Sequence, residues 1–251
     1  MSEILYGRQV VAECLRAGRR AVHRLFVAAG ARGTGRVDDV LQAAARRRLP
    51  VLETDKSRLD RLTSSGHHQG LALEAEPYPY VSIEDVLAAR REGEPPFLLI
   101  LDHLQDPQNL GSLLRTAEGA GVTGVVIPKD RAAAVTPAVV RASSGASEHL
   151  LVARVANIVA AMGAARDAGL WVYGLDSDPG APRLAEARLD GPVALVVGNE
   201  GQGLARLVRE RCDARARLPM RGHVESLNAA VSGAIALYEI RRQRDARAAK
   251  A

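Results

Sequence analysis

The spacing of hydrophobic residues alternates between helical and strand patterns over residues 1–76. Apolar positions recur every three or four residues over 7–18 and 36–48, which predicts amphipathic helices, and a shorter helix is predicted over 56–65. The segments between and after them, VHRLFVA, LPVLET and GLALEAE, are short apolar runs of the kind that form strands. This alternation predicts a compact α/β domain over residues 1–76.

From residue 97 onward, apolar strands alternate with helical stretches. The strand candidates are FLLILD, GVVIP, LLVARV, LWVYGLD, VALVVGN and ARARLPM, and the final helix is expected to begin near Ser226. Continuously apolar strands separated by helices are typical of a mostly parallel sheet covered on both faces. Ligands of such sheets bind at the carboxyl ends of the strands, so the residues after each strand are candidates for chemistry.

Residues 77–96, between these two regions, are acidic and contain four prolines. Their composition predicts a linker with a helical middle. We therefore expect an α/β protein of two domains: a small domain over residues 1–76, the linker 77–96, and a larger, mostly parallel α/β domain over 97–251.

The formal net charge of +5 is unevenly distributed along the chain. Residues 1–72 hold 13 Lys and Arg against 7 Asp and Glu, residues 73–96 hold 2 against 6, and residues 241–251 hold 5 against 1. A basic domain suits a nucleic-acid partner, because phosphate contacts supply most of the non-specific affinity. Solvated arginines on helix faces would give the same charge, so both interpretations remain open.

Other bulk features argue against several classes of protein. No apolar run is long enough to span a membrane, and the first residues do not form a signal peptide. Cys14 and Cys212 stand far apart, without a CxxC motif or a cluster of histidines. We expect a cytoplasmic protein with reduced thiols, no metal and no contact with membranes.

The segment GAGVTG, residues 119–124, matches the dinucleotide-binding pattern G-x-G-x-x-G by its letters alone. That motif must follow a strand and begin a helix, so that the helix N-terminus meets the pyrophosphate. Here the glycines end a predicted helix and lead into the strand GVVIP. They therefore favour a helix C-cap over a nucleotide site.

The first stretch with candidate chemistry, DHLQDPQNLGSLLRTAEGAG, follows the strand FLLILD. Asn109 is expected at the start of the helix, where Asn is a favoured N-cap. Arg115 is predicted to share a face with Gly111, Glu118 and Gly119, with room beside it for a large ligand. A solvated Arg115–Glu118 pair would explain the same pattern.

The second stretch, VALVVGNEGQGL, is a strand that ends in a glycine-rich loop. Gly198, Gly201 and Gly203 permit close approach of a ligand to the backbone. Glu200 lies where a carboxylate could grip a substrate group, although it could equally favour the N-terminus of the next helix.

The third stretch, RLPMRGHVESLNAAVSGAIALYEIRRQR, contains the start of the final helix. Ser226 or Asn228 could cap this helix. The small residues that follow would let another backbone or a flat ligand lie close.

Together, these stretches carry N-x-G-x-x-x-R, L-x-x-G-x-E-x-x-G and L-P-M-x-G-x-x-x-S-L-N in order, and this set resembles the motifs of the SpoU (TrmH-type) RNA 2'-O-ribose methyltransferases. The resemblance covers the whole larger domain. Near the N-terminus, ILYGRQVVAECL and HHQGLALE resemble the small substrate-binding domain of the RlmB branch, whose members methylate a guanosine of bacterial 23S ribosomal RNA.

The resemblance implies a SPOUT-type domain with a C-terminal trefoil knot, through which the protein forms a homodimer. It also implies S-adenosylmethionine as cofactor and no metal. The cofactor pocket would be formed by Gly198, Leu218, Met220 and Leu227. The family's catalytic positions correspond to Arg115, Asn109, Glu200, Ser226 and Asn228.

The family assigns activation of the ribose hydroxyl to Arg115. A guanidinium is a poor base, so holding a phosphate and stabilising the forming alkoxide is an easier role, and both remain open. Arginines of the first domain are expected to hold the RNA backbone; these are Arg8, Arg16, Arg19, Arg20, Arg24 and Arg46–Arg48. The alternatives are the same chemistry on a tRNA or another ribosomal nucleotide, or an RNA-binding protein without catalysis.

Overall fold

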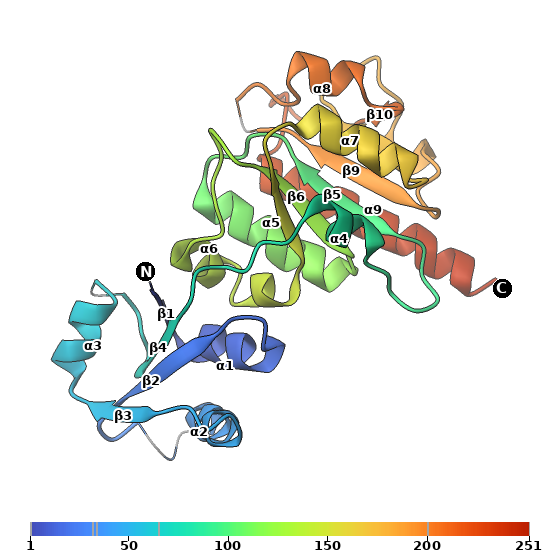
Figure 1. Cartoon of the computed structure of the whole chain (residues 1–251). Coiled ribbons are helices and arrows are strands. Elements are labelled where there is room, and N and C mark those ends of the chain that lie inside the picture. The colour runs from blue at the N-terminus through green and yellow to red at the C-terminus, as the bar shows by residue number, and fades with distance from the viewer. Residues whose placement is uncertain (1, 32, 34, 65, 200, 251) are drawn as a thin grey trace. The chain divides into compact units, whose positions relative to one another are not determined.

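The computed structural model describes residues 2–31, 33, 35–64, 66–199 and 201–250. The chain forms two compact units, which we call the first and the second unit (Figure 1). The first comprises Met1–Pro79 and Val135–His149, and the second comprises Tyr80–Ala134 and Leu150–Ala251. From the sequence we placed residues 135–149 in the larger domain, whereas here they pack within the first unit.

The first unit is built on a four-stranded sheet in the order β1-β4-β2-β3. Strands β1 and β2 run antiparallel to β4, and β3 runs parallel to β2. The predicted helices and strands of this region are confirmed, and β1 is an addition to them. The bounds are β1 Glu3–Tyr6, α1 Arg8–Ala17, β2 Val22–Ala28, α2 Arg36–Arg46, β3 Val51–Thr54, α3 Lys56–Leu62, β4 Leu71–Ala75, α6 Pro137–Ala142 and the 3-10 helix η1 Ala146–His149.

Buried polar contacts join residues 135–149 to the rest of the first unit. The fully buried guanidinium of Arg20 lies 2.9 Å from the carboxylate of Glu148, which is itself 1% exposed, and 2.7 Å from that of Glu3. The Nε2 atom of His149 lies 2.8 Å from Oε2 of Glu13. Arg20 is therefore part of the interior, so the expectation that it holds an RNA backbone is wrong.

The second unit contains a six-stranded sheet in the order β10-β8-β9-β5-β6-β7, and every neighbouring pair of strands is parallel. The mostly parallel α/β fold predicted from the sequence is confirmed. The bounds are α4 Ile83–Ala88, β5 Phe97–Leu101, α5 Pro107–Ala120, β6 Gly124–Pro128, β7 Val152–Val155, α7 Ile158–Asp167, β8 Trp171–Leu175, η2 Leu184–Glu186, β9 Val193–Val197, α8 Arg206–Glu210, β10 Ala214–Ala216 and α9 Ala229–Ala248.

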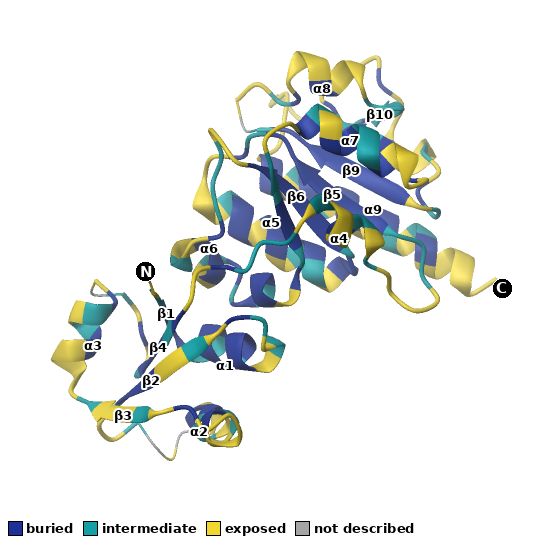
Figure 2. Ribbon diagram, viewed as in Figure 1, coloured by how far each residue is buried: buried dark blue, intermediate teal, exposed yellow. Residues whose placement is uncertain are grey.

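Helices cover both faces of this sheet, whose central strands are buried throughout (Figure 2). Alternate residues such as Ile100 and Val196 pack towards α4, α7 and α8. On the other face α5 and α9 lie side by side (Figure 1), and α9 approaches so closely at Gly233 that a side chain there would overlap Leu113. The small residues of α9 thus serve helix packing as well as the pocket described below.

The helix predicted in the linker is α4, and it is packed into the second unit. Its Val86 is buried in the core of the sheet, and Val81, just before it, forms a parallel bridge with Ala153. Its N-cap, Ser82, forms a capping box with Asp85, which satisfies backbone groups at the start of this short helix.

Candidate functional site

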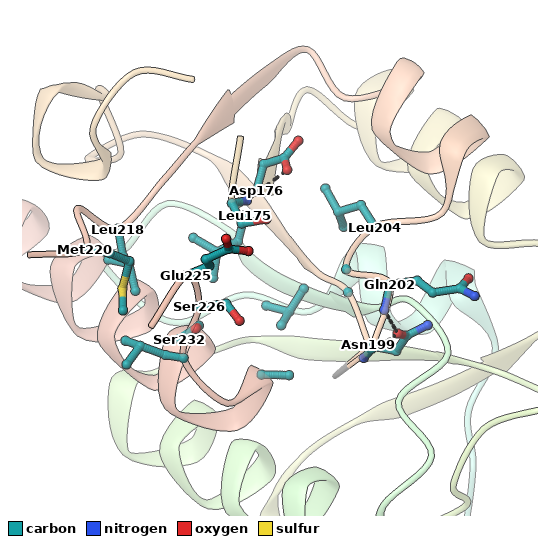
Figure 3. A pocket seen from close by; sticks show the side chains of 17 residues that line it. Leu175, Asp176, Asn199, Gln202, Leu204, Leu218, Met220, Glu225, Ser226 and Ser232 are labelled. Carbon is teal, nitrogen blue, oxygen red and sulfur yellow. Dashed lines mark hydrogen bonds between the residues drawn. The ribbon is translucent and has the colours of Figure 1, made fainter. Parts of the chain in front are cut away.

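A pocket of about 200 Å³ lies at the carboxyl ends of β8 and β9, the location expected for ligands of a parallel sheet (Figure 3). Its walls come from the residues that follow β8, β9 and β10 and from the first turn of α9. The described lining residues are Leu175, Asp176, Ser177, Val197, Gly198, Asn199, Gly201, Gln202, Gly203, Leu204, Leu218, Met220, Glu225, Ser226, Leu227, Ala229 and Ser232.

The wall after β9 is a tight, closed loop. The backbones of Asn199 and Gly203 pair through two hydrogen bonds of 3.1 and 3.2 Å. A Cβ atom at Gly198 would overlap the backbone of Gly203 and Leu204, so only glycine fits there. The Asn199 side-chain oxygen accepts hydrogen bonds from the backbone of Gly201 (3.0 Å) and Gln202 (2.8 Å). The described residues of this wall are therefore joined by hydrogen bonds among themselves, from the backbone and from the Asn199 side chain.

A buried carboxylate of the pocket lining, that of Asp176, joins three secondary-structure elements beside the pocket. Its Oδ1 accepts hydrogen bonds from the backbone of Ser177 (2.8 Å) and Asp178 (3.2 Å). Its Oδ2 lies 3.2 Å from Arg209 of α8 and 3.1 Å from Arg215 of β10. The ends of β8 and β10 and the helix after the glycine loop are thus tied together at one side chain.

Asp176 was not among the site residues expected from the sequence, although it is the last residue of the predicted strand LWVYGLD. The rule that ligands bind at the carboxyl ends of parallel strands was sufficient to select it. Asp102, after β5, was missed for the same reason. Its carboxylate is buried, lies 2.7 Å from Nδ1 of His103, and accepts a 2.7 Å hydrogen bond from the backbone of Ala205, where the glycine loop leads into α8.

The four residues predicted to bind the cofactor, Gly198, Leu218, Met220 and Leu227, all line this one pocket. Ser226, predicted at the edge of the site, lines it too. The loop after β9 and the segment after β10 are thereby brought together. Whether these residues bind the expected ligand remains a prediction.

Two predicted site residues from opposite ends of the second unit form a direct contact. The side-chain nitrogen of Asn228 donates a 3.1 Å hydrogen bond to the side-chain oxygen of Asn109. The Asn228 oxygen caps α9 by accepting from the backbone of Ala230 (2.8 Å) and Val231 (3.2 Å), so the orientation of the amide is fixed. Cap and contact are therefore two functions of one side chain.

The expectation that Asn109 caps its helix is wrong. Helix α5 begins two residues earlier with Pro107, and Asp106 is the N-cap, whose carboxylate accepts a 2.9 Å hydrogen bond from the backbone of Gln108. Proline at the first helical position normally follows the cap, which is the signal that could have identified Asp106. Asn109 lies inside the first turn, so its side chain can reach Asn228.

Arg115 lies on the exposed face of α5, six residues after Asn109. Gly111, expected beside it, is buried, whereas Gly119 is exposed and lies near the hydroxyl of Tyr238. Only part of the predicted open surface around Arg115 is therefore present. Glu200 lies outside the described residues.

The segment GAGVTG has the role predicted for it. Helix α5 ends at Ala120, Gly121 caps it in the left-handed conformation at φ 82°, and β6 begins at Gly124. The glycines thus follow a helix and precede a strand, the reverse of the order that a dinucleotide site requires.

The described lining of the pocket includes two acidic residues, Asp176 and Glu225, and no Lys, Arg or His.

Near Asp176, burial raises the pKa of the Cys212 thiol to about 12, and the charges of Asp213 and Asp176 act in the same direction. This thiol is therefore protonated and unreactive at neutral pH.

Among the described residues, no helix is both long and apolar enough to cross a membrane. The His, Cys, Asp and Glu side chains of the same residues form no group of three or more that could hold a metal ion.

The geometry agrees with comparisons to known proteins. The profile of the SpoU rRNA methylase family matches residues 96–238, and the profile for RNA 2'-O ribose methyltransferase substrate binding matches residues 4–81. A protein of Mycobacterium sp. (strain KMS), named as an uncharacterized tRNA/rRNA methyltransferase, is 45% identical over 97% of this chain and 77% of its own length. One from Bacillus subtilis (strain 168), named for the TrmH family of tRNA/rRNA methyltransferases, is 39% identical over 97% and 96%.

Solved structures are similar over almost the whole chain. The SpoU methyltransferase AviRb from Streptomyces viridochromogenes, in complex with the cofactor AdoMet, has a TM-score of 0.81 at 25% identity and covers 98% of this chain and 91% of its own. The AdoMet-bound rRNA methyltransferase from Sinorhizobium meliloti has a TM-score of 0.78 at 27% identity and covers 96% and 87%. The chain belongs to the SpoU rRNA methylase family and is an RNA methyltransferase.

Proposed function

We propose that this enzyme transfers a methyl group from S-adenosylmethionine to the 2'-hydroxyl of a ribose in RNA, and that its target is a guanosine of 23S ribosomal RNA. The observation that carries the proposal is the convergence of the three motifs. Gly198, Met220 and Ser226 line one pocket, and Asn228, two residues after Ser226, is hydrogen-bonded to Asn109.

The pocket suits the proposed cofactor in shape and charge. The small side chains of Ala229 and Ser232 leave room beside apolar Leu218 and Leu227. The acidic lining suits a ligand that carries a positive charge. When bound, S-adenosylmethionine would supply a methyl group that is already activated as part of a sulfonium, so no metal is needed. The solved relatives that carry AdoMet support this assignment.

In the proposed reaction, the residues of this chain align the attack and stabilise charge. A lone pair of the ribose 2'-oxygen would form the new O–CH3 bond, the pair of the S–CH3 bond would stay on sulfur, and the hydroxyl proton would pass to water. Arg115 stays protonated and stabilises the oxygen as negative charge develops, while its fork can hold a neighbouring phosphate. Asn109, fixed by Asn228, would orient the ribose.

The first unit is proposed to bind the RNA, which the match of residues 4–81 to a substrate-binding profile supports. The structure reduces the set of arginines available for this role. Arg19 is hydrogen-bonded to Tyr78 and Pro79, and Arg24 is ion-paired with Glu74. Exposed basic side chains at the surface are the better candidates, namely Arg46, Arg48, Lys56, Arg58 and Arg61.

Homodimer formation through the second unit, with a trefoil knot near the C-terminus, is part of the proposal. Val231, Ile235 and Tyr238 lie at helical spacing on α9, and all three are exposed in the single chain. These three side chains form an exposed apolar stripe on α9, which is suited to contact with a second copy of the chain. The cytoplasm is the proposed location, because ribosomal RNA is the proposed substrate.

The decisive experiment is to map 2'-O-methylation across ribosomal RNA and tRNA in cells with and without this protein. Loss of one methyl group at a 23S guanosine supports the proposal. Loss at a tRNA or at another ribosomal nucleotide would keep the chemistry and change the target. No change at any ribose, together with RNA binding in vitro, would identify an RNA-binding protein without this activity.

A further inference from the structure

The two carboxylates of the pocket lining, those of Asp176 and Glu225, differ in exposure and in their partners. Asp176 is 8% exposed, and both its oxygens are engaged by backbone N–H groups and by Arg209 and Arg215. Glu225 is exposed, and no described residue pairs with its carboxylate. Figure 3 shows both side chains on the same side of the pocket, near Leu175 and away from Asn199 and Gln202.

Because of this difference, only one of the two carboxylates has a negative charge that is not balanced by a neighbouring arginine. Arg209 and Arg215 compensate Asp176, and Arg215 also lies 3.2 Å from Asp178. The described lining offers Glu225 no basic residue in return. Glu225 is therefore the uncompensated charge among the described lining residues, and it contributes a negative potential to the pocket.

A negative potential separates two ligands that are otherwise nearly identical. Under the proposed function, the cofactor carries a fixed positive charge on sulfur. After transfer the S–CH3 bonding pair remains on sulfur, so the product, S-adenosylhomocysteine, is an uncharged thioether there. The adenosine and amino-acid parts of the two molecules are the same, so contacts to those parts cannot distinguish them.

We propose that Glu225 is a specificity-determining residue, whose carboxylate makes the pocket prefer the sulfonium cofactor over the product and thereby favours product release. This proposal rests on the proposed function. Asp176 has a different role: it holds together the elements around the pocket, so both ligands depend on it. The two carboxylates thus differ in function because arginines balance the charge of Asp176 and not that of Glu225.

The expected effect is modest because Glu225 is exposed to water. Opposite charges within a few ångströms, screened by a dielectric between that of a protein surface and that of water, give about a threefold to tenfold preference. Salt should reduce the preference, since exposed charges are screened over about 8–10 Å at physiological ionic strength.

The test is calorimetric titration of the full chain with S-adenosylmethionine and with S-adenosylhomocysteine, at low and at high salt. In Glu225→Gln we expect S-adenosylmethionine to bind about threefold to tenfold more weakly at low salt, while the Kd of S-adenosylhomocysteine stays within about twofold. Asp176→Asn should weaken both ligands, because Arg209 and Arg215 lose the carboxylate that joins them. The matched control is Glu210→Gln, which removes one exposed carboxylate from α8 outside the pocket lining and should leave the ratio of the two Kd values unchanged.

The outcomes separate this proposal from the proposed function. Because the ratio of two Kd values is independent of the active fraction, partial unfolding of a variant does not obscure it. An unchanged ratio in Glu225→Gln, or an equal change in Glu210→Gln, overturns the role of Glu225 while leaving the methyltransferase proposal intact. If the wild-type chain binds neither ligand, the cofactor assignment itself is wrong.

Discussion

Arg20 and Arg115 show two uses of the same residue type. Arg20, in the first unit, is completely buried between Glu148 and Glu3. Attraction to these carboxylates raises the pKa of Arg20, although burial alone would lower it. Arg115, in the second unit, lies on the exposed face of α5, and the opposite face of this helix is apolar and buried. Both are arginines, but the side chain of Arg20 is enclosed by the protein whereas that of Arg115 is exposed to solvent. Burial, rather than charge, therefore decides which of these arginines is a candidate for contact with a substrate.

The largest effect is expected from removing the buried arginine. Arg20→Ala leaves the carboxylate of Glu148 buried and unpaired, which should lower the free energy of unfolding by about 3–5 kcal/mol. Trp171 is the only tryptophan and belongs to the second unit. We expect the urea transition followed by far-UV circular dichroism to shift to lower urea concentration, while the transition followed by Trp171 fluorescence changes little.

Two variants sharpen this prediction. Arg16→Ala removes an exposed arginine whose side chain is 67% accessible, so it should cost well under 1 kcal/mol. Arg20→Met combined with Glu148→Met removes both charges and should recover much of the loss. A loss in Arg20→Ala no greater than that in Arg16→Ala would show that the buried pair is not what holds residues 135–149 in place.

The second largest effect is expected at Arg115, on activity rather than stability. Arg115→Ala should lower methyl transfer to unmodified ribosomal RNA by roughly 100-fold to 1000-fold, as removal of one group that stabilises developing charge commonly does. Its melting temperature should be unchanged, since the side chain is exposed. Arg115→Lys keeps the charge but loses the fork, so an intermediate activity is expected. Full activity in Arg115→Ala would exclude Arg115 from the site.

The third effect, at Asn228, divides stability from activity within one side chain. Asn228→Ala loses the cap of α9 and should cost about 1 kcal/mol of stability. Asn228→Asp keeps an acceptor for the backbone of Ala230 and Val231 but cannot donate to Asn109. We expect the Asp variant to keep the wild-type melting temperature and lose activity in the methyl-transfer assay. Equal activity in wild type and Asn228→Asp would mean that the Asn109 contact has no catalytic importance.

Much of the fold could be predicted because helix and strand periodicity are local properties. The order of elements in both units follows from apolar spacing. The second and third motifs line one pocket because loops at the carboxyl ends of parallel strands converge, and the first motif reaches the third through the hydrogen bond between Asn109 and Asn228. The burial of Arg20 could not be predicted in this way. Its partner Glu148 is 128 residues away, and no local pattern distinguishes a paired arginine from a solvated one.

The missed residues have different causes. Asp106 and Asp176 each had a local signal. Asp106 precedes a proline at the first helical position, and Asp176 follows the last residue of a strand. Glu225 has no local signal, since it lies in a loop of exposed residues. Its relation to the pocket appears only when β8, β10 and α9 are placed together in three dimensions.

The smallest effect is expected from pH, through Glu13 in the first unit. Burial raises the pKa of this carboxyl, but hydrogen bonds and charges from His149 and Arg16 outweigh it, so the pKa in the folded protein lies below the ordinary value of 4.5. A carboxyl with a depressed pKa stabilises the fold above its unfolded pKa, and this contribution is lost as the pH falls from 4.5 through the lower folded value. We therefore expect the circular-dichroism transition to move to lower urea concentration below about pH 4.5, less steeply in Glu13→Gln, while the Trp171 transition is identical in the two proteins. The change should be small because Arg16 is largely exposed and screened by water. An unaltered pH dependence in Glu13→Gln would show that the buried pair of Arg20 and Glu148 holds residues 135–149 without help from the Glu13–His149 contact.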